Sequence, residues 1–346
     1  MSKLIRGIVF LIAGICLFVF SLSQVDLFEL FLSLKNLFIW KFVVLFCIFF
    51  TGIIVIGSMR WKWILRAQGY SVPLKQIIGA KSVGFAISYL TPTVFLGGEP
   101  FRYMLLKKLN NKIPPETLAA SIFLDKLAFL VMSSFSFFVG LFFLDRYLPL
   151  FAGWRWLILG IGVLFFCGIP LLIIGLKTLL SKKSLLLWIF AKLQLLRLPV
   201  LKNNSSKIEK FEQKIDTLFR YRFHDFLGAI IFAFFEILLL LVGYWLIIDF
   251  IARPLVFDKI LSINSFIQGA YFLPFPGGLG TFEVSQVFLF QQIGLSKTVG
   301  MSFSLIVRAI NLLMAFGALF YFIVFQFLQL KSKLLKLINF DEKKEA

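Results

Sequence analysis

Two stretches of sequence decide the expected fold. Ala86–Arg102 reads AISYLTPTVFLGGEPFR, and Gly269–Glu283 reads GAYFLPFPGGLGTFE. Each combines an apolar approach, a proline, a Gly-Gly pair and a glutamate within a very hydrophobic chain. At membrane depth, non-helical backbone and carboxylates persist only where protein shields them or where they line a cavity. Because the combination occurs in both halves of the chain, it predicts a transporter built from repeats.

The composition indicates a helical integral membrane protein. Of the 346 residues, 60% are hydrophobic and 15% are charged. Apolar runs of about 20 residues match the length of a helix that spans a bilayer. A soluble domain cannot bury this much apolar surface. The predicted fold class is therefore an all-α polytopic membrane protein.

The residue inventory predicts neither a metal site nor a cofactor. Cys16, Cys47 and Cys167 lie far apart in apolar runs, and His224 is the single histidine. This spacing matches no metal-binding or disulfide pattern. The net charge of +19 is expected to reside in basic cytoplasmic loops that face anionic lipid headgroups. We therefore expect membrane phospholipid, and not nucleic acid, as the partner.

Basic residues predict the sidedness of the spans. Lys3 and Arg6 precede the first apolar run, which places the N-terminus in the cytoplasm. The connection 23–40 holds few cations and is expected outside, whereas Arg60 follows a second span at 42–59 and is expected in a cytoplasmic loop. Three lysines after the last span predict a cytoplasmic C-terminus: Lys331, Lys333 and Lys336.

Charge counting also predicts an inverted repeat. Segments 76–100 and 261–295 each begin and end on one side, so we expect two re-entrant helical hairpins that enter from opposite faces. If 261–295 were a single span, the C-terminus would lie outside, against its lysines. With 42–59, the expected spans number about six: 8–22, 116–144, 156–176, 226–250 and 299–330.

The chain divides into two membrane repeats and a loop. Residues 1–180 form the first repeat, and residues 226–346 form the remainder of the second repeat with a short cytoplasmic tail. Between them, 181–225 is expected to be a basic cytoplasmic loop with an interfacial helix at Ser184–Arg197. Ordinary positive-inside charge explains this loop without a specific ligand.

Each hairpin carries a carboxylate, and the next long helix carries a cation. Glu99 is followed by Lys126, and Glu283 is followed by Arg308. We predict that each set forms an ion pair, because pairing lowers an insertion cost of about 2.5–3.5 kcal/mol per charge. Such pairs either pin the hairpins or border a polar path for a substrate.

Three further side chains are candidates for the same path. Arg102 shares a helix face with Glu99 and offers a planar fork that matches phosphate, unless it reaches for the headgroup layer. Asp125 is expected to contact another helix or Arg102. Glu236 has no local partner in its span. It is either a proton-coupling or cavity carboxylate, or a buried hydrogen-bonded group.

The expected hairpin turns are rich in proline and glycine. Glycine permits positive φ and close backbone approach, and half-helices that end at such turns direct their N-terminal amides toward an anion. A phosphate headgroup would suit that position. The turn residues are Pro92, Gly97 and Gly98 in the first motif, and Pro274, Pro276, Gly277, Gly278 and Gly280 in the second.

These motifs resemble those of a known family. PFPGGLGTFE at Pro274–Glu283, followed by RAIN at Arg308–Asn311, is similar to the signature of the lysylphosphatidylglycerol synthase transmembrane-region family, also called flippase-like or UPF0104 proteins. GGEPFR at 97–102 and Asp125-Lys126-Leu127 resemble its earlier motifs. Lys126 departs from the arginine frequent in the family and lacks its bidentate fork. The resemblance implies a lipid flippase domain, with Asn311 among the substrate-binding residues.

The sequence thus predicts an inner-membrane lipid translocator for an anionic or aminoacylated phospholipid or another lipid-linked phosphate. We do not expect enzymatic activity, because the residues after the last predicted span are too few to form the soluble aminoacyl-transfer domain of the bifunctional members. The alternative is an accessory or scaffold protein for a lipid- or glycan-modifying enzyme. An intramembrane transferase is less favoured, since Asp125, Glu236 and His224 form a poor catalytic set. The second hairpin, which pairs with an arginine, is expected to matter more for substrate.

Overall fold

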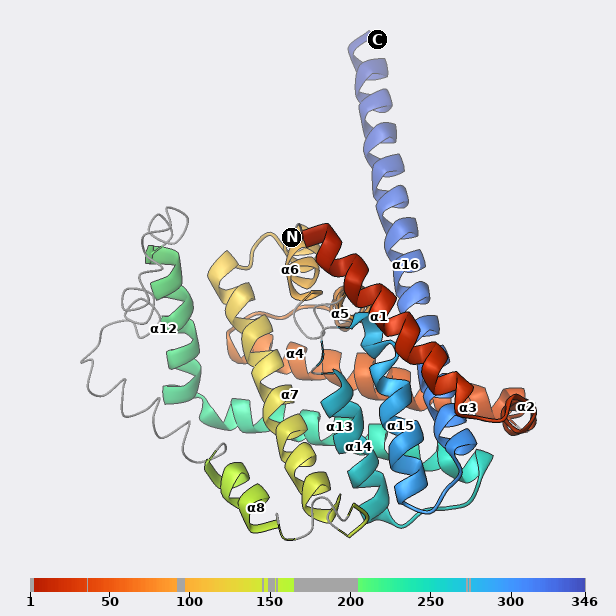
Figure 1. Ribbon diagram of the computed structural model, residues 1–346. Helices are drawn as coiled ribbons and strands as arrows, with labels where there is room; N and C mark the ends of the chain where they lie inside the picture. The colour runs from red at the N-terminus through yellow and green to blue at the C-terminus, as the bar shows by residue number, and fades with distance from the viewer. Residues whose placement is uncertain are drawn as a thin grey trace.

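The computed structural model describes residues 3–35, 37–91, 97–144, 146–148, 153, 155–164, 205–271, 273 and 275–345. This part of the chain is helical and contains no strand (Figure 1), which confirms the all-α class. Most of the predicted span 156–176 lies outside the described residues, as do the predicted interfacial helix Ser184–Arg197, Pro92 and Pro274.

The helices fall into two series on either side of residues 165–204. The first series is α1 (Lys3–Ser23), α2 (Leu27–Lys35), α3 (Ile39–Phe50), the π-helical turn η1 (Thr51–Ile56), α4 (Gly57–Ala67), α5 (Leu74–Leu90), α6 (Glu99–Leu109), α7 (Pro115–Leu144) and α8 (Arg155–Val163). The second is α12 (Ser205–Tyr221), α13 (Phe223–Ile251), α14 (Phe257–Tyr271), the 3₁₀ turn η5 (Pro276–Gly278), α15 (Thr281–Gln292) and α16 (Lys297–Glu345).

The described helices identify a multi-pass membrane protein. Four segments are long and apolar enough to cross a bilayer: Ile39–Ala67, Pro115–Leu144, Phe223–Ile251 and Lys297–Val324. A fifth candidate is the pair Leu11–Ser23 and Leu27–Lys35, which is bent by 90°. The count of six spans depends on 156–176 and stays a prediction.

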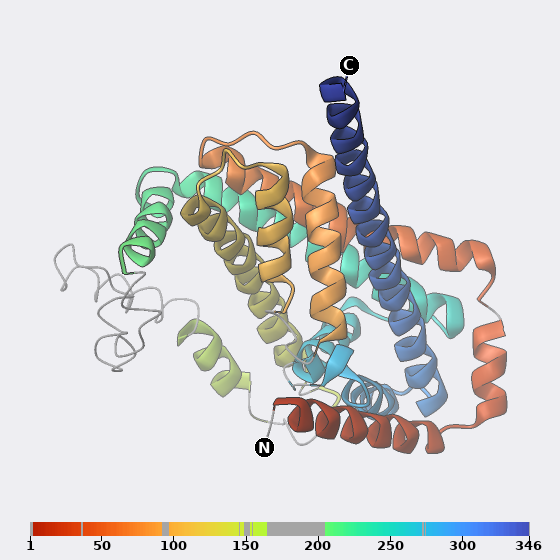
Figure 2. The ribbon, with the colours of Figure 1, turned by 90° about the horizontal axis from the view of Figure 1, so that it is seen from above.

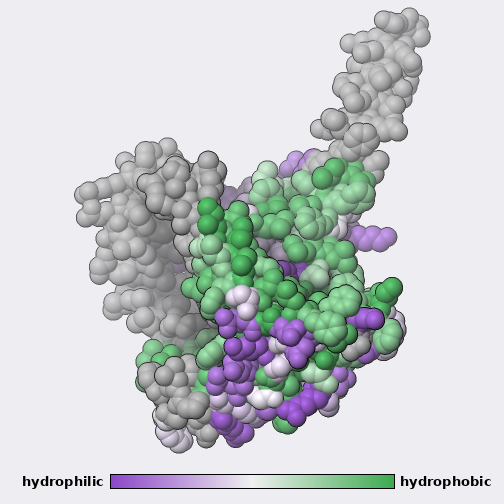
Figure 3. Space-filling view, turned by 45° about the vertical axis from the view of Figure 1, so that its right-hand side comes forward, coloured by the Kyte–Doolittle hydropathy of each residue, from purple (hydrophilic) through white to green (hydrophobic). Residues whose placement is uncertain are grey.

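Apolar side chains also cover much of the outer surface. Figure 3 shows them gathered over the body of the molecule, with polar side chains concentrated toward its lower part. Ile39 is 84% exposed and Phe320 is 71% exposed. In water, apolar patches of this extent mark interaction surfaces. Contact with lipid explains them here, because hydrocarbon tails solvate such side chains.

Helix α2 lies within the predicted connection 23–40. One predicted boundary in the first repeat was wrong. The second span does not end at Met59, because α3 continues through η1 into α4. Continuous helix keeps backbone groups hydrogen-bonded inside a bilayer. Arg60 therefore lies within this helical rod and not in a cytoplasmic loop.

Both breaker motifs separate pairs of packed helices. α5 packs on α6, and α14 packs on α15. In the second motif, Gly277 and Gly278 have φ of 55° and 64° around η5. Segment 261–295 is accordingly two helices and not one continuous span. The first hairpin extends past its predicted end at residue 100, because α6 continues to Leu109.

The two hairpins meet at their tips. α5 contacts η5, and a Cβ placed on Gly277 would lie 3.2 Å from Tyr89 Cζ. In Figure 1 the pair α5 and α6 lies in the upper part of the body, and α14 and α15 lie in the lower part. The two hairpins therefore approach each other from different parts of the body, and their entry from opposite faces of the membrane stays a prediction.

Three long helices hold the hairpins together. α16 packs on α15 and on α5, so it contacts both hairpins. It then projects beyond the rest of the molecule (Figure 2). α7 packs on α14, α13 and α6, and α13 packs along α3, η1 and α4. Side chains from all of these helices can therefore reach the region between the hairpin tips.

Candidate functional site

A cavity of about 240 Å³ lies where the hairpins meet. Its lining runs from Phe49 on α3 to Asn311 on α16. Tyr89 at the end of α5 and Gly277 at the tip of the second hairpin are both part of the wall. Seven charged side chains from α4, α5, α6, α7 and α13 also line it: Arg60, Lys81, Glu99, Arg102, Asp125, Lys126 and Glu236.

Arg60 joins three spans. It is 2% exposed, and its Nε donates to Asp125 Oδ1 of α7 at 2.7 Å. Its Nη1 donates to Glu236 Oε2 of α13. The Arg60 guanidinium also lies 5.4 Å from the centroid of the Phe129 ring. Burying three charges is tolerable only because each is paired and hydrogen-bonded.

Asp125 is the centre of the charged network. Its Oδ2 accepts from Arg102 Nη2 at 2.7 Å and lies 3.5 Å from Lys81 Nζ. Asp125 therefore contacts both Arg102 and another helix, which were the two expected alternatives. Arg102 is 5% exposed, and its Nε has no hydrogen-bond partner among the described residues. Arg102 is buried, and its guanidinium is directed at Asp125 and not at the outer surface of the protein.

Glu99 pairs with Lys126, as predicted. Lys126 Nζ lies 3.3 Å from Glu99 Oε1, and Arg102 Nη1 lies 3.7 Å from the same oxygen. This contact ties the first turn of α6 to α7. The cation is a lysine, so its point charge cannot form the two parallel bonds that an arginine makes to a carboxylate or phosphate.

The charges of the cavity do not cancel. Counted as formal charges, four cations, Arg60, Lys81, Arg102 and Lys126, face three carboxylates, Glu99, Asp125 and Glu236, and four minus three leaves one positive charge. Each carboxylate is paired with at least one of the cations. The surplus favours an anion in the cavity, and low-dielectric walls strengthen that attraction.

Two glycines make room for the network. A Cβ on Gly57 would lie 2.4 Å from Lys81 Nζ, and a Cβ on Gly84 would lie 2.3 Å from Arg102 Cγ. Neither glycine is at positive φ, so the requirement is close approach and not backbone conformation. Arg102 then stacks on Trp61, with its Cζ 4.3 Å from the ring centroid.

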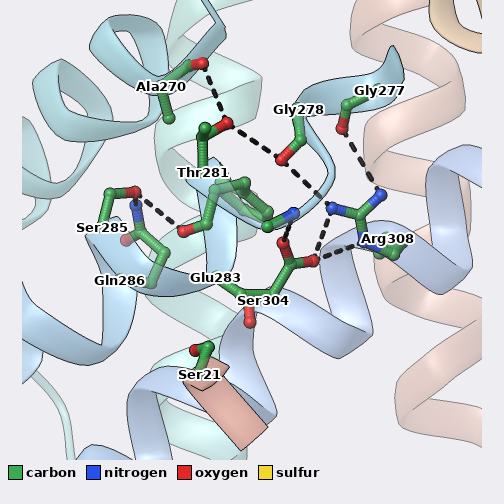
Figure 4. Close-up of polar contacts among 12 residues, drawn as sticks. Ser21, Ala270, Gly277, Gly278, Thr281, Glu283, Ser285, Gln286, Ser304 and Arg308 are labelled. Atoms are coloured by element: carbon green, nitrogen blue, oxygen red, sulfur yellow. Dashed lines mark hydrogen bonds and ion pairs between the residues drawn. The ribbon is translucent and has the colours of Figure 1, made fainter. Parts of the chain in front are cut away.

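Glu283 and Arg308 form the second predicted ion pair. Arg308 Nε and Nη2 both lie 2.5 Å from Glu283 Oε1. Arg308 also donates to the carbonyls of Gly277 and Gly278 at 3.4 Å (Figure 4). Glu283 Oε2 accepts from the Gly280 N–H at 2.8 Å and so caps α15. This pair fixes the tip of the second hairpin to α16.

The predicted residues thus fall into two groups. Glu99, Arg102, Asp125, Lys126, Glu236 and Asn311 line one cavity, together with Gly277. Glu283 and Arg308 are outside its lining and hold the hairpin tip. Gly98 packs closely on α5, since a Cβ there would lie 1.8 Å from Gly84 O.

Sequence reasoning missed two members of the network. Arg60 was assigned to a loop because it follows the apolar run of its span. Lys81 was overlooked, although a lone lysine inside the apolar segment 76–100 is the signal that could have identified it. The sequence showed no local partner for Glu236, because its partner, Arg60, is 176 residues away.

Comparison with known proteins identifies the family. The model of the lysylphosphatidylglycerol synthase TM region matches residues 5–318. UPF0104 membrane protein MJ1595 of Methanocaldococcus jannaschii is 35% identical over 99 residues, which are 28% of this chain and 29% of that protein. No solved structure matches this chain. Because the family model covers nearly the whole chain, including both hairpins and the cavity, this protein belongs to the lysylphosphatidylglycerol synthase transmembrane-region family.

Proposed function

We propose that this protein moves a lipid with an anionic phosphate headgroup across the cell's inner membrane, with both termini in the cytoplasm and no covalent chemistry. The observation that carries the proposal is the surplus positive charge of a cavity that lies where the two hairpin tips meet. A buried surplus charge is unfavourable in a bilayer. An anionic headgroup would neutralise it.

The geometry favours the headgroup over the acyl chains as the cavity's occupant. Ligand pockets for drug-sized molecules are about 300–1,000 Å³, and this cavity is about 240 Å³. The acyl chains would remain in the surrounding lipid. Arg102 is the proposed phosphate ligand, because its Nε lacks a partner among the described residues and guanidinium matches phosphate geometry.

The two hairpins are the proposed gates. Transporters with inverted repeats expose a fixed central site alternately by moving one repeat against the other. Here Tyr89 and Gly277 meet at the junction of the hairpins. We propose that separation on one side of this junction opens the cavity to one leaflet, while the other side stays closed. Lys126 with Glu99, and Arg308 with Glu283, would hold each hairpin in its closed position.

Reconstitution tests the proposal. Purified protein is placed in vesicles with acyl-labelled phosphatidylglycerol, and a membrane-impermeant quencher reports how fast label reaches the outer leaflet. Wild type is expected to accelerate this exchange over empty vesicles. Arg102→Gln is expected to slow it at least about tenfold, as loss of a charge-assisted contact implies. Arg66→Gln, on the exposed side of α4, is the matched control. Exchange no faster than in empty vesicles contradicts the proposal.

A further inference from the structure

The cavity has an uncharged polar wall in addition to its charged one. Ser133 of α7, Asn264 and Gln268 of α14, and Asn311 of α16 line it. Ser133 Oγ donates to Gln268 Oε1 at 2.7 Å, and Asn264 Nδ2 donates to Ser136 Oγ at 2.9 Å. These two bonds hold the amides of α14 in fixed orientations against α7.

Asn311 belongs to this wall and has a hydrogen-bond acceptor without a donor among the described residues. Its side chain lines the cavity, the residue is 7% exposed, and its Oδ1 has no hydrogen-bond partner among the described residues. A buried amide oxygen without a donor is unfavourable. A ligand that brings an O–H or N–H group into the cavity would satisfy it.

The charged side chains of the cavity favour a hydroxyl group over an ammonium group as this donor. Every carboxylate of the cavity is already engaged: Glu99 with Lys126 at 3.3 Å, Asp125 with Arg102 at 2.7 Å, and Glu236 with Arg60. An ammonium group on the ligand would compete with these cations for the carboxylates and would face the surplus positive charge. A hydroxyl group meets neither obstacle, and it can donate and accept at once, as an amide does.

Building on the proposed translocator function, we infer that the transported headgroup is an uncharged polyol or sugar joined to the lipid through a phosphate, and not an aminoacyl headgroup. The phosphate lies against Arg102, and the hydroxyls lie against Asn264, Gln268 and Asn311. Tyr244 and Tyr271 line the same cavity and add aromatic side chains to its wall. Sites with a few placed polar groups on a largely apolar lining are typical of specific ligand pockets.

Headgroup competition in reconstituted vesicles tests this inference. Four acyl-labelled lipids are compared: phosphatidylglycerol, a glycosylphosphoryl lipid, phosphatidic acid and lysylphosphatidylglycerol. At least one of the first two is expected to cross about tenfold faster than either of the others. Phosphatidic acid lacks the headgroup hydroxyls that the site is built to bind, and the lysyl group brings ammonium charge toward the surplus positive charge of the cavity. The comparison between the first two separates polyol from sugar. Lysylphosphatidylglycerol or phosphatidic acid crossing as fast as both hydroxylated lipids overturns the inference.

Substitutions at Asn311 and Gln268 test whether the uncharged wall sets the headgroup preference. Asn311→Leu is expected to reduce the ratio of hydroxylated lipid to phosphatidic acid by about tenfold, and Gln268→Leu is expected to act in the same direction. Gln291→Leu removes an exposed amide on α15 and should leave the ratio unchanged. A monodisperse elution profile and an unaltered melting temperature show that each variant is folded. An unchanged ratio in both folded cavity variants counts against the inference.

The outcome also separates this inference from the proposed function. If wild type moves none of the four lipids, translocation itself fails. If it moves all four at similar rates, translocation stands and only the headgroup assignment is lost.

Discussion

Arg60 Nε lies 2.7 Å from Asp125 Oδ1, and this hydrogen bond joins spans that are 65 residues apart in the sequence. Both side chains are almost completely buried, at 2% and 1% exposed. Asp125 also binds Arg102, and Arg60 also binds Glu236. One arginine and one aspartate therefore connect α4, α6, α7 and α13 around the cavity.

Removing Arg60 should destabilise the protein strongly. Arg60→Gln leaves Glu236 without its partner and Asp125 with one cation fewer, and breaking a buried ion pair in this way costs about 3–5 kcal/mol. Thermal unfolding in detergent measures the effect. Arg66→Gln removes an exposed arginine from the same helix and is expected to change stability by no more than about 0.5 kcal/mol. Equal melting temperatures for the two variants would contradict the structural role of Arg60.

The space that Gly57 leaves for Lys81 should be required for activity. Gly57→Ala places a methyl group 2.4 Å from Lys81 Nζ and 2.6 Å from its Cε, so the ammonium must move from its position 3.5 Å from Asp125. The crowding should cost about 1–3 kcal/mol and slow lipid exchange. Adding Lys81→Ala to Gly57→Ala removes the clash and should recover stability. A double variant no more stable than Gly57→Ala would show that the strain lies elsewhere.

Gly98 should be essential for the first hairpin. In Gly98→Ala the new methyl group would lie 1.8 Å from the backbone oxygen of Gly84, and backbone cannot move aside as a side-chain tip can. We expect α5 and α6 to separate and the melting temperature to fall. Gly269→Ala is the control on the second hairpin, because a Cβ there meets nothing within 4 Å. That change should be neutral or stabilise by up to about 1 kcal/mol.

Glu283 and Arg308 should behave as a coupled pair. Glu283→Gln and Arg308→Met each leave one buried charge without its partner, so each should be strongly destabilising. The double variant leaves no unpaired charge and should be less destabilised than the sum of the two single variants, by about 0.5–3 kcal/mol. Additive effects on the melting temperature would show that the pair does not hold the hairpin tip.

Tyr147 should make stability depend on pH in the alkaline range. Its hydroxyl donates to Asp258 Oδ2 at 2.7 Å and links the end of α7 to the start of α14. Desolvation, then the hydrogen bond and the charge of Asp258, raise the pKa of Tyr147 from 10.0 to about 12. Because the folded-state pKa is raised, this stabilisation is complete below pH 10 and is lost as pH rises toward 12.

The Tyr147→Phe variant isolates this contribution. Melting temperatures of wild type and variant are measured from pH 9 to pH 12. The difference between them should shrink as pH rises, and a constant difference across the range would exclude the linkage.

Much of the architecture follows from local sequence. Apolar run length predicted the helices α7 and α13 to within three residues at each end, because bilayer thickness and backbone hydrogen bonding dictate both length and conformation. The glycines and prolines at 97–98 and 274–280 predicted the two helix breaks. The pairs Glu99–Lys126 and Glu283–Arg308 were predicted because each carboxylate lies on a hairpin and its cation lies on the next long helix in the sequence.

The tertiary structure alone decided which charges share the cavity. Arg60 and Glu236 are far apart in sequence, and no local pattern relates them, so their pairing depends on α4 packing along α13. Lys81 reaches Asp125 only because Gly57 leaves space on a different helix. The sequence by itself determined a membrane protein with two broken-helix motifs. Tertiary packing also determined that Arg102 of the first motif and Gly277 of the second motif both line the cavity, whereas Glu283 and Arg308 pair outside its lining and hold the hairpin tip. Burial of a charge is unfavourable unless it is paired, so these contacts could form only once the distant helices had packed.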